Sequence, residues 1–167
     1  GIYTMLNHSF GRNGLTIKGK WEANSDYSNP AVREKLLKEV KDMVNQYKGT
    51  PGLLLFLLGN ENKYGLFWSG AEMEKIPMQD RKQTIEAGHM YKLFNDAVKE
   101  MKAVDNSLPI AICNGDLLFS DIIAKECTDI DILGINTYRG LTFTDLYDKA
   151  KKEINKPIKA TWQAGPA

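Results

Sequence analysis

The feature that most constrains the fold is a run of apolar residues, Leu53 to Leu58, that no polar residue interrupts. A strand with one face in water alternates apolar and polar residues, whereas a parallel strand covered on both faces is apolar throughout. The run is far shorter than the stretch of about 20 residues that spans a membrane. It therefore predicts a buried strand of a parallel sheet.

Other apolar segments of strand length alternate along the chain with segments of helical periodicity. Pro30 follows the capping residue Asn29, and apolar residues then recur every three or four positions until Gly49, which predicts a long helix. The alternation indicates an α/β fold. We expect further strands at residues 2–6, 109–113, 130–135 and 157–161, and further helices at residues 80–104, 120–126 and 146–154.

The length of 167 residues allows one domain, which we take to cover residues 1–167. The net charge of +1 gives no basic excess, so neither a nucleic acid nor an anionic membrane surface is an expected partner. Cys113 and Cys127 form no CxxC pair and have no pair of histidines nearby, which argues against a metal site and against a disulfide scaffold. We expect two buried free thiols.

The expected strands and helices suit either a doubly wound sheet or part of a (β/α)8 barrel. The connection at residues 7–28 is long and contains neither GxGxxG nor a complete GxxxxGK[ST], the phosphate-binding patterns of nucleotide-binding sheets, because Trp21 follows Lys20 where the second pattern needs Ser or Thr. A second long loop, with several aromatic residues, follows the strand at 53–58. Because loops at the carboxyl ends of strands build the active sites of barrels, we favour a partial TIM (β/α)8 barrel that lacks about three of its eight units.

Asn60 and Glu61 come just after the buried strand at 53–58. This position places a carboxyl group at the strand tip, half shielded by apolar neighbours, where it suits a general acid. Glu61 is therefore the leading catalytic candidate. The alternative is a glutamate that caps the loop or forms a salt bridge there.

Polar residues also follow the other expected strands: Asn136 and Tyr138 the fourth, Asn114 the third and His8 the first. The carboxyl ends of parallel strands meet at one rim, where amide and phenol groups can bind sugar hydroxyls. Trp68, in the aromatic loop, can stack on the apolar face of a sugar ring. Each residue also has a structural interpretation. Tyr138 can be a hydrogen-bonded residue of a turn, His8 a structural histidine, and Trp68 an aromatic residue that packs its loop against the barrel.

Five short motifs follow one another along the chain: Gly1-Ile2-Tyr3, Tyr47-Lys48-Gly49-Thr50-Pro51-Gly52, Leu58-Gly59-Asn60-Glu61-Asn62, Ile132-Leu133-Gly134-Ile135-Asn136-Thr137-Tyr138-Arg139-Gly140 and Lys156-Pro157-Ile158. Their order and spacing resemble the barrel domain of glycoside hydrolase family 2, whose retaining enzymes include β-galactosidases and β-glucuronidases. The resemblance covers almost the entire chain, as barrel strands three to seven.

The resemblance implies that Glu61 is the acid/base, that Asn60 contacts the sugar 2-hydroxyl, and that Tyr138 sits beside the nucleophile. Family members carry that nucleophile as the Glu of a Thr-Glu pair after the Lys-Pro-Ile element, where this chain has Trp162. A retaining mechanism needs two carboxyl groups about 5 to 5.5 Å apart. The family also implies a β-linked glycoside as substrate, no cofactor, an extracellular or periplasmic location, and remaining barrel segments or further domains of a longer parent chain as partners.

Three explanations of Trp162 stay open: an altered position in an ordinary hydrolase, a natural non-catalytic relative that keeps the sugar cleft as a binding module, and an unrelated structural fragment or doubly wound domain. We expect part of a family 2-like retaining glycosidase that has little or no activity with Trp162 in place, because one carboxylate is missing. Glu61 is the expected acid/base, and the expected sugar-site residues are Asn60, His8, Trp68, Asn114, Asn136, Tyr138 and Trp162.

Overall fold

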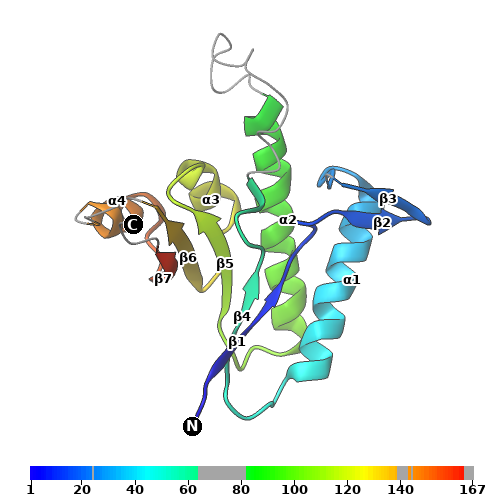
Figure 1. Cartoon of the computed structure of the whole chain (residues 1–167), viewed down its shortest axis with the longest axis horizontal. Helices are drawn as coiled ribbons and strands as arrows, with labels where there is room; N and C mark the ends of the chain where they lie inside the picture. Colours follow the sequence, from blue (N-terminus) through cyan, green and yellow to red (C-terminus); the bar gives the residue numbers. More distant parts are fainter. Residues whose placement is uncertain (24, 64–81, 139–142, 144, 164–167) are drawn as a thin grey trace.

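The computed structural model describes residues 1–23, 25–63, 82–138, 143 and 145–163, the last five of these as backbone only. Its main sheet has five parallel strands in the order in which they occur along the chain (Figure 1). The strands are β1 (Thr4–His8), β4 (Leu53–Leu58), β5 (Ile110–Gly115), β6 (Ile132–Thr137) and β7 (Ile158–Gln163).

Four helices follow the strands: α1 (Pro30–Tyr47), α2 (Lys82–Val104), α3 (Ser120–Glu126) and α4 (Leu146–Ile154). Each helix packs against the next one along the chain, as Figure 1 shows. All four contribute to one core, on one face of the sheet, whereas a doubly wound sheet carries helices on both faces. The fold is therefore a consecutive segment of a (β/α)8 barrel, which confirms the predicted fold class.

The two faces of the sheet differ because successive strand residues point to opposite sides. Phe56 and Leu58 of β4, like Ile110 and Ile112 of β5, belong to the large core shared with the helices. The opposite face carries a small separate cluster in the concave interior of the barrel segment: Leu55, Leu57, Ala111 and Cys113, with Ile132 packed against it. The direction of each side chain at a strand tip follows from this alternation.

The start of α1 forms as predicted. The side chain of Asn29 accepts a hydrogen bond of 2.9 Å from the backbone N–H of Ala31, and Pro30 occupies the first turn, where it sacrifices no intrahelical bond. The helix ends at Tyr47, just before Gly49. Both cysteines are free and buried, as expected, and burial raises the pKa of the Cys127 thiol.

Two features differ from the sequence-based expectation. The connection after β1 contains a short antiparallel hairpin, β2 (Leu15–Ile17) and β3 (Lys20–Glu22), whose three-residue strands are too short to show a periodicity. Several sheet strands also end about two residues later than predicted, because backbone pairing continues into their polar tips. No helix in the described part of the chain is long and apolar enough to cross a membrane.

Candidate functional site

Glu61 lies at the tip of β4 in an unusual backbone conformation. The chain turns at Gly59, whose φ is +74°, and Glu61 itself has a φ of +55°, in the left-handed region that L-residues avoid. The Glu61 N–H donates a hydrogen bond of 3.0 Å to the carbonyl of Cys113 in β5. This bond holds the turn against the neighbouring strand and leaves the side chain only 7% exposed.

Tyr138 supplies a direct partner for this carboxyl group. Its hydroxyl donates a hydrogen bond of 2.9 Å to Glu61 Oε1, although the two residues come from strands separated by β5. Both line a cavity of about 390 Å³ at the carboxyl ends of the strands. The lining residues are Met5, Leu57, Asn60, Glu61, Cys113, Asn136 and Tyr138.

Two amides and a thiol meet beside Glu61. Asn136 Nδ2 donates a hydrogen bond of 3.0 Å to Asn60 Oδ1, and the Cys113 thiol donates to Asn136 Oδ1 at 3.4 Å. The Asn60 Nδ2 group has no hydrogen-bond partner within the described ranges of the chain, and Asn60 is solvent-exposed. This amide therefore offers an oriented donor to a ligand in the cavity.

Asn62 stabilises the turn that carries Glu61, through hydrogen bonds to Asn60 and to the loop after β1. Its Oδ1 accepts from the Asn60 N–H at 2.9 Å, while its Nδ2 donates to the Phe10 carbonyl at 2.8 Å and to the Tyr27 hydroxyl at 3.0 Å. Burial raises the pKa of Tyr27 to about 12, so this phenol stays neutral. Arg12 adds a second tie from the same loop, since its Nε donates to the Asn60 carbonyl at 2.9 Å.

Lys63 is a buried cation next to the turn. The side chain is almost fully enclosed, and its amine donates a hydrogen bond to the carbonyl of Gly115 at the end of β5. Burial lowers the pKa of Lys63 to about 8, against the opposing effect of the carboxylates of Glu61 and Asp116.

The structure places two predicted site residues elsewhere. Asn114 follows Ile112 in phase, so its side chain points toward the helices, where Tyr91 donates to its Oδ1 at 2.7 Å. His8 is in phase with Leu6 and lies 3.5 Å from Glu39 of α1, measured from Nε2 to Oε2. Neither lines the cavity beside Glu61. The expectation that all strand-tip polar groups share one pocket was wrong for these two, because alternate residues face opposite sides.

The remaining predicted residues are aromatic. Trp68 lies outside the described residues. The backbone of Trp162 pairs with Asn136 in the β6–β7 register, so position 162 belongs to the strand next to the cavity. Sequence reasoning did not single out Met5, Cys113 or Lys63. In the structure Cys113 shares the cavity-side face of its strand with Ala111, which the uninterrupted apolar sequence of that strand did not reveal.

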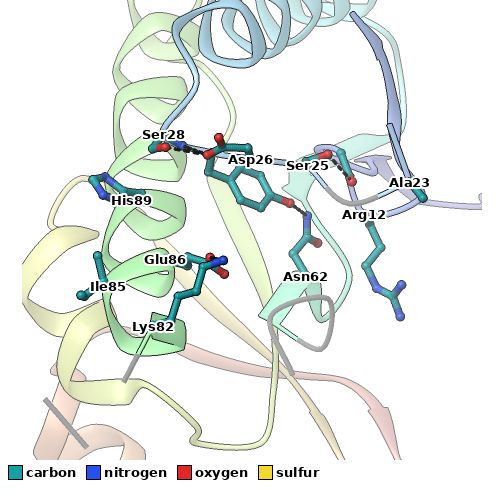
Figure 2. Close-up of a pocket in the computed structure, with 12 residues that line it drawn as sticks. Arg12, Ala23, Ser25, Asp26, Ser28, Asn62, Lys82, Ile85, Glu86 and His89 are labelled. Carbon is teal, nitrogen blue, oxygen red and sulfur yellow. Dashed lines mark hydrogen bonds and ion pairs between the residues drawn. The ribbon is translucent and has the colours of Figure 1, made fainter. Parts of the chain in front are cut away.

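A larger cavity, of about 450 Å³, lies behind Asn62, between the loop after β1 and the first turns of α2 (Figure 2). Among the predicted site residues that the structure describes, none lines it. Several of its charged groups have partners within the cavity wall: Lys82 lies 3.3 Å from Glu86, and hydrogen bonds from Ser28 lower the pKa of Asp26. We therefore place the candidate site at Glu61.

Comparisons with known proteins agree with a glycosidase-like fold. No protein-family model matches the sequence, and neither does any curated protein. Among solved structures, the chain is similar to a β-D-glucuronidase from Dictyoglomus thermophilum, with a TM-score of 0.52 and 17% identity over 83% of this chain. It is also similar to a β-glucuronidase from Bacteroides uniformis, with a TM-score of 0.58 and 14% identity over 78% of this chain.

The matched region is a small part of those enzymes, 22% of the first chain and 15% of the second. The similarity thus concerns the fold of one segment. The chain is structurally similar to part of the β-glucuronidase fold.

Proposed function

We propose that this chain is part of the barrel domain of a retaining glycoside hydrolase of the family 2 type, acting on β-linked glycosides, with Glu61 as its acid/base. The observation that carries the proposal is the bond from the Tyr138 hydroxyl to Glu61 Oε1, at 2.9 Å, in a cavity at the carboxyl ends of barrel strands. Active sites of this fold lie at that face. The structural similarity to two β-glucuronidases supports the same assignment.

In the proposed reaction, protonated Glu61 gives its proton to the glycosidic oxygen while a second carboxylate attacks the anomeric carbon. Glu61 then takes a proton from the water that hydrolyses the glycosyl-enzyme intermediate. Asn60 and Asn136 present amide groups to sugar hydroxyls, and Tyr138 orients the Glu61 carboxyl group. This chemistry requires no cofactor.

The second carboxylate is the missing part. Trp162 occupies the position that the family resemblance assigns to the nucleophile, and its backbone pairs with Asn136 of the cavity. A tryptophan cannot form a glycosyl ester, so we expect the chain with Trp162 to bind glycosides and not to hydrolyse them. The same observation favours a second candidate function, a non-catalytic carbohydrate-binding relative.

The proposal also assigns the chain's partners. Within the described residues, β1 pairs only with β4 and β7 only with β6, so each has one free edge. We propose that further barrel strands of a longer parent chain cover these edges, because a closed barrel leaves no unpaired edge.

Sugar binding tests the site. We expect p-nitrophenyl β-D-glucuronide or β-D-galactoside to shift the NMR signals of Tyr138 and of the Asn60 and Asn136 amides, and we expect Asn60→Ala to weaken that binding. Asn45→Ala, on the exposed face of α1, is the matched control. If neither aryl glycoside shifts these signals, the sugar site is wrong.

Hydrolysis tests the acid/base. We expect Trp162→Glu, made in a chain completed with the missing barrel strands, to release p-nitrophenol from one of these glycosides. The added Glu61→Gln change should slow that release by roughly 10² to 10⁴-fold. Release that persists undiminished in the double variant would remove Glu61 from the proposed role. A binding module would bind the glycoside equally well and gain no turnover from Trp162→Glu.

A further inference from the structure

Lys63 is the buried charged group next to Glu61 that the proposed reaction does not yet use. It follows Glu61 by two residues and is only 2% exposed. Lysine is almost never fully buried unless its charge is paired, because removing an ammonium group from water is costly. The surroundings of Lys63 must therefore offset the free-energy cost of burying its ammonium group.

The geometry around Gly115 indicates what offsets this cost. A Cβ atom added at Gly115 would lie 3.1 Å from Glu61 Oε1, 2.9 Å from Lys63 Cε and 3.2 Å from Lys63 Nζ. The Glu61 carboxylate and the Lys63 amine therefore both approach the space beside Gly115, which a side chain there would fill. The Lys63 amine also donates to the Gly115 carbonyl, so its position relative to β5 is fixed.

The elements packed around Glu61 and Lys63 each contribute a charged or polar group to their surroundings. Glu61 and Asp116 act on Lys63 from the β4 turn and from the segment after β5, and the neutral Tyr138 hydroxyl faces Glu61 from the end of β6. The Cys113 thiol lines the same cavity from β5. Lys63 is the cation in this group, placed between two carboxylates.

We propose that Lys63 is a positioning residue for Glu61: its ammonium group holds the carboxylate toward Tyr138 and stabilises the charge that remains after Glu61 has given up its proton. This inference rests on the proposed acid/base role of Glu61. A nearby cation stabilises the negative charge that a carboxylate carries once its proton has gone to the glycosidic oxygen. Lys63 loses its proton and its positive charge in alkaline solution, so its effect on Glu61 depends on the protonation state of Lys63.

Titration of the Lys63 side chain by ¹³C NMR, in the full 167-residue chain without sugar, tests the coupling. We expect a midpoint at a pH of about 8 in the unmodified protein. Glu61→Gln keeps the shape of the side chain and removes its charge, so it should lower that midpoint by roughly one unit, a tenfold change in the proton affinity of Lys63. Glu86→Gln, on α2, should leave it unchanged.

A second experiment examines the reciprocal effect on the Tyr138 ring signals at neutral pH, which report its bond to Glu61. Lys63→Met should shift these signals, and Lys63→Arg should restore them because it keeps the charge. A merely structural lysine would give no such rescue by charge.

An unchanged Lys63 midpoint in Glu61→Gln, together with Tyr138 signals that do not respond to Lys63→Met, would overturn the inference. These experiments need no ligand, so they separate it from the proposed function: a chain that binds no glycoside counts against the sugar site, while the coupling of Lys63 to Glu61 stands or falls by these two measurements.

Discussion

The Glu61 side chain is held by a backbone that costs free energy. A non-glycine residue in the left-handed region is unfavourable by roughly 1–3 kcal/mol and persists only where its surroundings impose it. Here the surroundings are the bond to the Cys113 carbonyl and the Asn62 amide that anchors the turn. Such strained residues cluster at active sites, which agrees with the proposed role of Glu61.

Two glycines give a matched test of crowding in this site. Gly115→Ala would push a methyl group against Lys63 Cε at 2.9 Å, whereas a Cβ at Gly88 of α2 meets nothing within 4 Å. We expect Gly115→Ala to lower the free energy of unfolding by about 1–3 kcal/mol. Gly88→Ala should raise it by about 0.5–1 kcal/mol, because alanine is the better helix former. Urea unfolding measures both, and equal effects would contradict the crowded geometry.

His8 makes stability depend on pH. Burial lowers the pKa of His8 in the folded protein, against the opposing charge of Glu39, so the unfolded chain takes up the proton more readily. The free energy of unfolding should therefore fall as the pH drops below about 6.5. His8→Gln should flatten this dependence between about pH 7 and pH 5, measured by urea unfolding at each pH, and an unchanged dependence would contradict the assignment to His8.

At the scale of elements, each helix is tied to the neighbouring unit by polar contacts as well as by the core. Arg33 of α1 bonds to Asp96 of α2 at 2.7 Å, but the pair is about one-third exposed and contributes little. Asn95 of α2 makes the more informative contact. It donates to Asp129 Oδ2 and accepts from the Asp129 N–H, both at 2.8 Å, just before β6.

Asn95→Ala should remove both of these bonds and leave a backbone N–H without its partner. We expect the free energy of unfolding at neutral pH to fall by about 1–3 kcal/mol. The Asn95 bond lowers the pKa of Asp129, so that part of the loss should shrink as the pH falls below the usual carboxyl range. If Asn95→Ala lowers the free energy of unfolding equally at neutral pH and below the usual carboxyl range, the effect comes from packing alone.

The strands and helices also show how much of the structure the sequence could predict. The apolar run at Leu53–Leu58 and the helical periodicities predicted the order of strands and helices correctly. They could not predict which face each tip residue occupies, because a strand buried on both sides has no polar alternation to show its phase. Asn136 and Tyr138 line the cavity beside Glu61, whereas Asn114 and His8 do not.

The whole sheet ends in the free edge of β1. Ile2 and Tyr3, next to that edge, are 89% and 69% exposed. Unpaired edges with exposed apolar side chains promote association between chains. We expect the weight-average molecular mass of the 167-residue chain, measured by sedimentation equilibrium, to rise with protein concentration. Tyr3→Lys should reduce that rise more than Tyr147→Lys on α4. A mass that does not depend on concentration would contradict this.

Within the described residues, each strand of the main sheet pairs only with the main-sheet strands that come before and after it along the chain. A segment built in this way can be divided or extended between one strand–helix unit and the next, until the sheet closes into a barrel and its number of strands is fixed. Gene duplication and fusion act on such whole units, and the boundaries between them are the places where pieces from different proteins can be joined.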